Sequence, residues 1–142
     1  MRQTAPAAQD LAQRLLALEA SVDNLPDVYA ASSTFEKLHL SLVKLIGVTG
    51  FQALLVRALA LAKTEVAWLA AVEVEADGTL RGFEENARKQ SAEETIQGEV
   101  TLLSQLLGLL ITFIGADLTL RLLKQIWSEL PSESNLGAEE IS

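Results

Sequence analysis

The chain has 142 residues, of which 49% are hydrophobic and 5% aromatic, and its net charge is −8. It contains no cysteine, which excludes disulfides, thiolate metal sites and cysteine nucleophiles from this chain. Nucleic-acid binding requires clustered lysine and arginine, and the sequence has no such cluster. A core rich in leucine and alanine rather than in aromatic residues favours helices over strands.

The charge is distributed unevenly along the chain. Residues 72–99 contain eight acids and three bases, and residues 129–142 contain four acids and no base. We therefore expect a single helical domain over residues 1–130 and an acidic, disordered tail over residues 131–142. The N-terminus lacks the uninterrupted apolar segment of a secretory signal, which favours a cytoplasmic location.

The first predicted helix begins near Ala8 and ends before Pro26, because proline cannot continue the helical hydrogen-bond pattern. Its apolar residues recur every three or four positions, at Leu11, Leu15, Leu18 and Val22. This spacing is typical of a coiled-coil seam and predicts packing against helices of this chain or of a second subunit. Glu19 lies off the seam, so we expect its carboxylate to be solvated.

A capping box predicts the start of the second helix. Ser33 and Glu36 have the spacing at which a hydroxyl and a carboxylate each satisfy a free backbone N–H group. The helix is then expected over residues 34–46 and ends at Gly47, since glycine is a common residue at helix ends.

The third predicted helix runs from Thr49, where the capping spacing recurs, to about Val72. One of its faces is formed by mostly small residues, Ala53, Arg57, Ala60 and Thr64. Arg57 is the only charged residue in the middle of this helix. A buried guanidinium group is costly without a partner, so Arg57 should either reach the surface or pair with an acid, and Asp117 is the first candidate.

After the third helix, the apolar residues no longer recur every three or four positions but at every second position. Residues 72–77 alternate between apolar and acidic side chains, and Asp77 and Gly78 follow as a turn dipeptide. This pattern predicts a short β-hairpin at about residues 72–82, with a two-residue type I′ turn. A short charged helix is expected next, over residues 83–90.

The last predicted helix is the most apolar part of the chain. Ser91 and Glu94 have the spacing of another capping box, and we interpret the stretch from Glu99 to Leu130 as one helix. Its first 17 residues after Glu99 carry no charge, so this helix must be buried, either in a protein core or in lipid.

This helix also carries a stripe of small or weakly polar residues, Ser104, Gly108, Thr112 and Ala116. We expect the stripe to pack against Ala53, Ala60 and Thr64 of the third helix in a soluble core. In a bilayer, however, the same spacing forms a helix association face, and in a dimer it could form the seam between two subunits. The uncharged run is at the lower end of the length that spans a membrane, so a soluble pairing is favoured.

One motif in the sequence has a known catalytic use. Glu36 and His39 are spaced as in four-helix di-iron carboxylate proteins, which need two such motifs and two further glutamates. The chain has one histidine, so only a homodimer could complete that site, with Glu65 or Glu99 of each subunit. The simpler interpretation is that Glu36 caps a helix and His39 borders an apolar face.

Other chemistry has no support in the sequence. The alternating acids of the hairpin do not match a calcium-binding loop, the glycines do not form a phosphate loop, and no nucleophile elbow is present. We therefore predict no catalytic residue, no metal ligand and no cofactor.

Together these patterns predict a mainly α fold, a compact bundle of four to five helices with one short β-hairpin before the last helices. We expect a small soluble protein–protein interaction module, an adaptor or regulatory subunit without enzymatic activity, which binds another protein and itself. The candidate contacts are the seam of the first helix, the hairpin tip at Asp77 and Gly78, and the aromatic residues Trp127 and Tyr29. The alternatives are a membrane-active protein that inserts its last helix, and a dimeric di-iron protein.

Overall fold

The computed structural model describes the backbone of residues 6–23 and 27–127, and the side chains of residues 8–21 and 33–127. The described part is a mainly α fold with a two-stranded hairpin, as predicted. Its elements are α1 (Pro6–Asp23), α2 (Asp27–Lys63), the 3-10 helix η1 (Ala67–Ala71), β1 (Glu73–Val74), β2 (Leu80–Arg81), α3 (Phe83–Ala87), α4 (Ala92–Ile114) and α5 (Ala116–Ile126).

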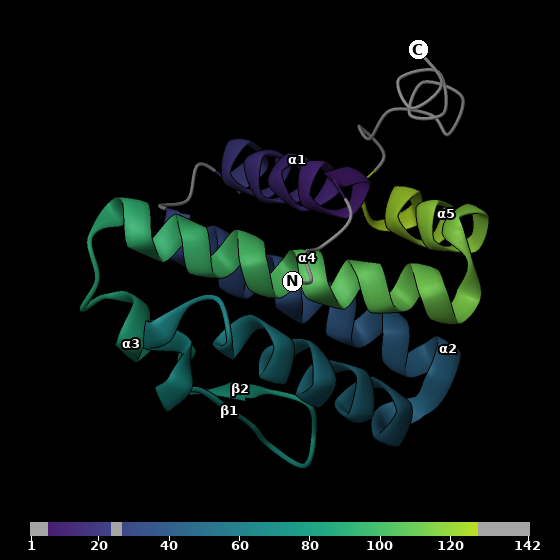
Figure 1. Ribbon diagram of the computed structural model, residues 1–142. Coiled ribbons are helices and arrows are strands. Elements are labelled where there is room, and N and C mark those ends of the chain that lie inside the picture. The colour runs from purple at the N-terminus through teal and green to yellow at the C-terminus, as the bar shows by residue number, and fades with distance from the viewer. Residues whose placement is uncertain (1–5, 24–26, 128–142) are drawn as a thin grey trace.

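Helix α4 runs through the middle of the bundle (Figure 1). It packs against α2, α1 and α5, and α2 also packs against α1. The hairpin and α3 lie against α2 and η1, away from α1 and α5 (Figure 1). The core is therefore a layer of long helices, and the hairpin is supported by one of them.

The seam of α1 faces helices of its own chain. Leu11 and Leu15 are buried, and Leu18 is half-buried against the same core. The side chain of Val22 lies outside the described residues. Because α2 and α4 cover this seam, the prediction that it serves as a contact surface for a partner is wrong.

Helix α2 begins earlier than predicted. It starts at Asp27, so Ser33 lies inside the helix, and its hydroxyl donates to the Glu19 carboxylate rather than capping a helix start. The predicted end at Gly47 corresponds to a kink, where the backbone has φ 85° and ψ 164°. After the kink the helix ends at Lys63, and η1 takes the place of the last predicted turns.

The hairpin forms where it was predicted, with Glu73 opposite Arg81 and Val74 opposite Leu80. Its turn is longer than the predicted type I′ turn. The N–H group of Gly78 donates to the carbonyl of Glu75, and Gly78 itself has φ 90°. This is a three-residue loop, in which a turn is followed by one glycine at positive φ.

The last predicted helix is two helices. The capping box of Ser91 and Glu94 is present at the start of α4. The helix then stops at Gly115, which has φ 92° and ψ 157°, and α5 begins at the next residue. The interpretation of residues 99–130 as one helix is therefore wrong, because glycine at this position allows a backbone conformation that other residues avoid.

The predicted contact between the two small-residue stripes is also wrong. Ala53, Ala60 and Thr64 are exposed, and so is Thr112. Both helices instead contribute large residues that are fully or almost fully buried in the core: Phe51, Leu55 and Leu59 on α2, and Leu102, Leu103, Leu106, Leu107 and Leu110 on α4. These residues bury more apolar area than the small stripe would, which decides the packing.

Candidate functional site

Four large apolar side chains remain exposed near the two glycine interruptions. Leu45 and Val48, beside the kink of α2, are 46% and 45% exposed, and Phe113 at the end of α4 is 63% exposed. Leu118, in the first turn of α5, is 41% exposed. We name these four side chains the apolar end surface, because the α2 kink and the turn between α4 and α5 lie at the same end of the bundle (Figure 1).

The two glycines explain why this end is uncovered. A Cβ atom placed on Gly47 or Gly115 would meet no atom within 4 Å, so the space beside both turns is open. Both residues have a positive φ, which turns the backbone sharply and ends the regular packing of the helices. The apolar residues next to these turns are therefore left facing solvent.

Basic charges predominate in two segments of the helices that form this end. Residues 37–64 contain four bases and no acid, and residues 100–127 contain two bases and Asp117. Residues 65–99, at the hairpin and the start of α4, contain nine acids and three bases. Within four residues of its side chains, these helices carry the bases Lys44 and Arg121 and the acid Asp117. A slight excess of basic charge near this surface favours an acidic binding partner.

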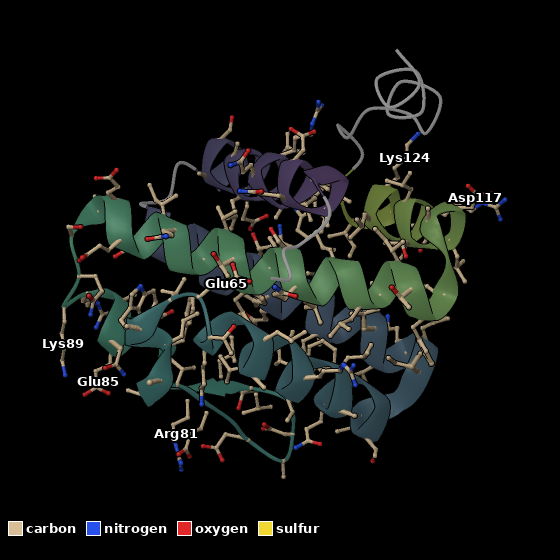
Figure 2. All side chains as sticks on the ribbon, in the orientation of Figure 1. Glu65, Arg81, Glu85, Lys89, Asp117 and Lys124 are labelled. Carbon is tan, nitrogen blue, oxygen red and sulfur yellow. The ribbon has the colours of Figure 1, made fainter. Side chains whose placement is uncertain are left out.

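Arg57 and Asp117 are both exposed. No ion pair joins them among the described residues, and Figure 2 shows Asp117 pointing away from the bundle on α5. Arg57 therefore takes the first of its two predicted options and reaches the surface. Gly108 is half-buried on α4, and the carbonyl of this residue accepts a hydrogen bond from the Thr112 hydroxyl.

Trp127 is not the exposed aromatic contact that was predicted. Its side chain is 2% exposed, and its indole N–H donates to the Glu19 carboxylate over 3.0 Å. Because α5 folds back after Gly115, the end of this helix reaches α1 and buries the indole ring. The side chain of Tyr29 lies outside the described residues.

The Glu19 carboxylate is not exposed to solvent, as was predicted, but buried. Its side chain is fully buried, and it accepts hydrogen bonds from Lys37, Ser33 and Trp127. Burial by itself raises the pKa of this carboxyl, but the three hydrogen bonds outweigh burial and hold the pKa below its ordinary value. Glu19 therefore joins three segments as a buried anion.

Of the two residues predicted to form a contact at the hairpin tip, only Asp77 is exposed. Gly78 is buried, and a Cβ atom placed on it would lie 2.9 Å from the Phe51 ring. Asp77 is exposed and accepts hydrogen bonds from the hydroxyl and the backbone N–H of Thr79, which lower the pKa of Asp77.

Glu36 and His39 line one cleft between α2, the hairpin and α3. Among the described side chains, no group of three or more histidine, aspartate or glutamate residues could hold a metal ion. Glu65, one of the glutamates considered for the di-iron site, accepts a hydrogen bond from Gln105. The dimeric di-iron hypothesis requires a second subunit and stays a prediction.

Sequence reasoning missed the apolar end surface. Phe113 lies in a run of apolar residues that was interpreted as one continuous buried helix. The available signal was Gly115, two residues later, because glycine commonly follows the last residue of a helix and leaves the end of that helix near solvent.

Two helical segments in the described part of the chain are long and apolar enough to cross a membrane, Ser33–Lys63 and Ala92–Ile114. This finding rests on length and composition, and the core helices of soluble proteins meet the same criterion. In α4, 56% of the most apolar window is buried inside the bundle.

The chain was compared with protein families, with curated proteins and with solved structures. None of these comparisons found a match.

Proposed function

We propose that this protein is a small interaction module, an adaptor or regulatory subunit without a reaction of its own, which binds another protein through the apolar end surface. The observation that carries the proposal is the exposure of Phe113, which at 63% is the largest among the described large apolar side chains. Exposed apolar side chains grouped on one part of a surface are typical of protein interaction sites, and aromatic residues frequently anchor them.

The partner segment follows from the charges around this surface. Lys44 and Arg121 are exposed on the helices that form it, and Asp117 is the only acid in residues 100–127. An amphipathic helix with an apolar face and acidic flanks would match both the apolar side chains and the two nearby bases.

The test is a quantitative pull-down with three forms of the full chain: the wild type, Phe113→Asp and Ile96→Asp. Ile96 is the matched control because it is an exposed apolar residue, 40% accessible, near the opposite end of the same helix. We expect one partner to be captured by the wild type and by Ile96→Asp, and captured about tenfold less by Phe113→Asp, because a charge at the centre of an interface costs on the order of 1.4 kcal/mol or more.

Two further measurements complete the test. Circular dichroism should show that both variants are folded, since both positions are exposed. Flotation with anionic vesicles tests whether the apolar end surface binds a membrane. Sedimentation of the purified protein tests whether it binds a second copy of the chain. If Phe113→Asp abolishes vesicle binding or self-association, and no partner protein is lost from the pull-down, the proposed function is wrong.

A further inference from the structure

The cleft that contains Glu36 and His39 is separate from the apolar end surface and has the size of a small-molecule site. Its volume is about 650 Å³, within the range of natural ligand sites. It is bounded by α2 on both sides of the kink, by the hairpin and by α3. Two parts of the chain, residues 35–55 and residues 78–88, therefore meet around one cavity.

The inner wall of this cleft contains a pair of stacked aromatic rings. The His39 ring is stacked on the Phe51 ring, with 4.8 Å between the centroids and 5° between the planes. Phe51 is 1% exposed, whereas His39 is half-buried and so presents its outer side to the cleft. Gly78 holds the hairpin close to both rings, because any larger residue would collide with Phe51.

A second aromatic pair lines the cleft from α3. Phe83 is 3% exposed, and its ring meets the ring of Phe35 edge to face at 5.8 Å. Both rings border the cavity. The two rings therefore back the cleft from α2 and α3, and most of its exposed apolar surface belongs to Leu40, which is 62% exposed.

The charges at the mouth of the cleft are mainly negative. Glu36 on α2 and Glu84 and Glu85 on α3 line it, against the single basic side chain of Arg88. A guanidinium nitrogen of Arg88 lies 3.7 Å from a carboxylate oxygen of Glu84, so Arg88 offsets the charge of Glu84. The balance of negative charge beside a low-dielectric wall attracts cations, and an aromatic face stabilises a cation close to it.

We propose that this cleft binds a small organic ammonium ion with a flat, apolar body. The apolar body lies on the His39 ring, which Phe51 supports from behind, and the ammonium group faces Glu36 and Glu85. This binding site goes beyond the proposed function and does not depend on it, because the apolar end surface and the cleft share no residue.

Three molecules with the same indole ring test the proposal in the full-length protein: tryptamine, which is a cation at neutral pH, tryptophol, which is neutral, and indole-3-acetate, which is an anion. His39 is the only histidine of the chain, so its ring protons give an isolated NMR signal. We expect tryptamine to shift this signal saturably, tryptophol to bind about tenfold more weakly and indole-3-acetate not to bind.

Two charge-neutralising variants locate the ammonium group. Glu36→Gln should weaken tryptamine binding about twofold to fivefold and leave tryptophol unchanged, because an exposed ion pair contributes up to about fivefold in affinity. Glu93→Gln removes the same charge outside the cleft, at the exposed start of α4, and should change neither. The proposal is overturned if the His39 signal does not move, if the three molecules bind equally, or if both variants have the same effect.

Discussion

Glu19 places a negative charge in the interior of the bundle. The carboxylate accepts hydrogen bonds from Lys37 over 2.8 Å and from the Trp127 indole over 3.0 Å, and a further one from Ser33. These donors come from α2 and from the end of α5, whereas Glu19 belongs to α1. A buried carboxylate is stable only with such donors, so this group links the three segments in one geometry.

The lowered pKa of Glu19 predicts a specific acid sensitivity. A carboxyl whose pKa is lower in the folded state than in the unfolded chain stabilises the fold at pH values above its unfolded value, ordinarily 4.5. This contribution is lost as the pH falls through the folded pKa. We expect Glu19→Gln to lower the free energy of unfolding by about 1–3 kcal/mol at neutral pH, and by much less at about pH 3.

Urea unfolding at the two pH values measures this difference. Asp10→Asn is the control, because Asp10 lies on the same helix and forms a half-exposed ion pair with Arg14 at 2.9 Å. Such a pair contributes little, so this variant should follow the wild type. An equal loss of stability for Glu19→Gln at both pH values would contradict the role of its charge.

Between elements, the contact of η1 with α4 depends on one glycine. The Trp68 indole donates to the carbonyl of Glu94 over 3.0 Å and lies directly on Gly98. A Cβ atom placed on Gly98 would be 2.4 Å from the Trp68 ring. The absence of a side chain at this position therefore lets the indole reach the helix backbone.

Replacing this glycine should reverse the usual effect of alanine in a helix. Gly→Ala inside a helix ordinarily stabilises by about 1 kcal/mol. We expect Gly98→Ala to destabilise the fold by about 1–3 kcal/mol, because the Trp68 ring must move and its hydrogen bond is weakened. Thermal unfolding measures the change, with Gln97→Ala as the exposed neighbouring control. A Gly98→Ala protein that is more stable than the wild type would show that the indole moves without cost.

The two helix breaks also determine how the helices pack against one another. Gly47 and Gly115 each turn the chain at a positive φ, and each leaves large apolar residues exposed beside it. The break at Gly115 separates α4 from α5 and lets α5 return to α1, where Trp127 reaches Glu19. One unbroken helix could not make this contact.

Across the whole molecule, the charges are separated along the chain. Residues 65–99 carry nine acids and three bases, and repulsion among the acids is relieved only in part by pairs such as those of Arg81 with Glu73 and Glu75. Salt screens repulsion between exposed charges. We expect the melting temperature at neutral pH to rise by roughly 2–5 °C between about 10 mM and 500 mM sodium chloride.

The control for this prediction is the same measurement near the isoelectric point, at pH 4.6, where the net charge is small and the rise should shrink. A melting temperature that is independent of salt at neutral pH would mean that the acidic segment is not under repulsion.

Local signals in the sequence predicted several features well. The capping box of Ser91 and Glu94, the interruption at Gly47 and the hairpin around Gly78 each depend on a few neighbouring residues and on backbone preferences. The capping box predicted at Ser33 failed because the hydroxyl found a buried carboxylate in another helix instead.

The candidate sites were less predictable. Phe113 and Leu102 lie on the same apolar helix, yet one is 63% exposed and the other is fully buried. Their residue types do not distinguish them, because the neighbours on α2 and the break at Gly115 decide which face is covered. The cleft likewise depends on the hairpin folding back onto α2.

Composition and local patterns are enough to specify a mainly α bundle with one hairpin, because helix propensity, apolar period and turn residues are properties of short segments. The three-dimensional arrangement alone places large leucines of α2 and α4 in the core, buries Glu19 and Trp127 together and leaves the apolar end surface open. These outcomes depend on contacts between distant segments, where packing area and the pairing of buried charges select one arrangement among many that the local pattern allows.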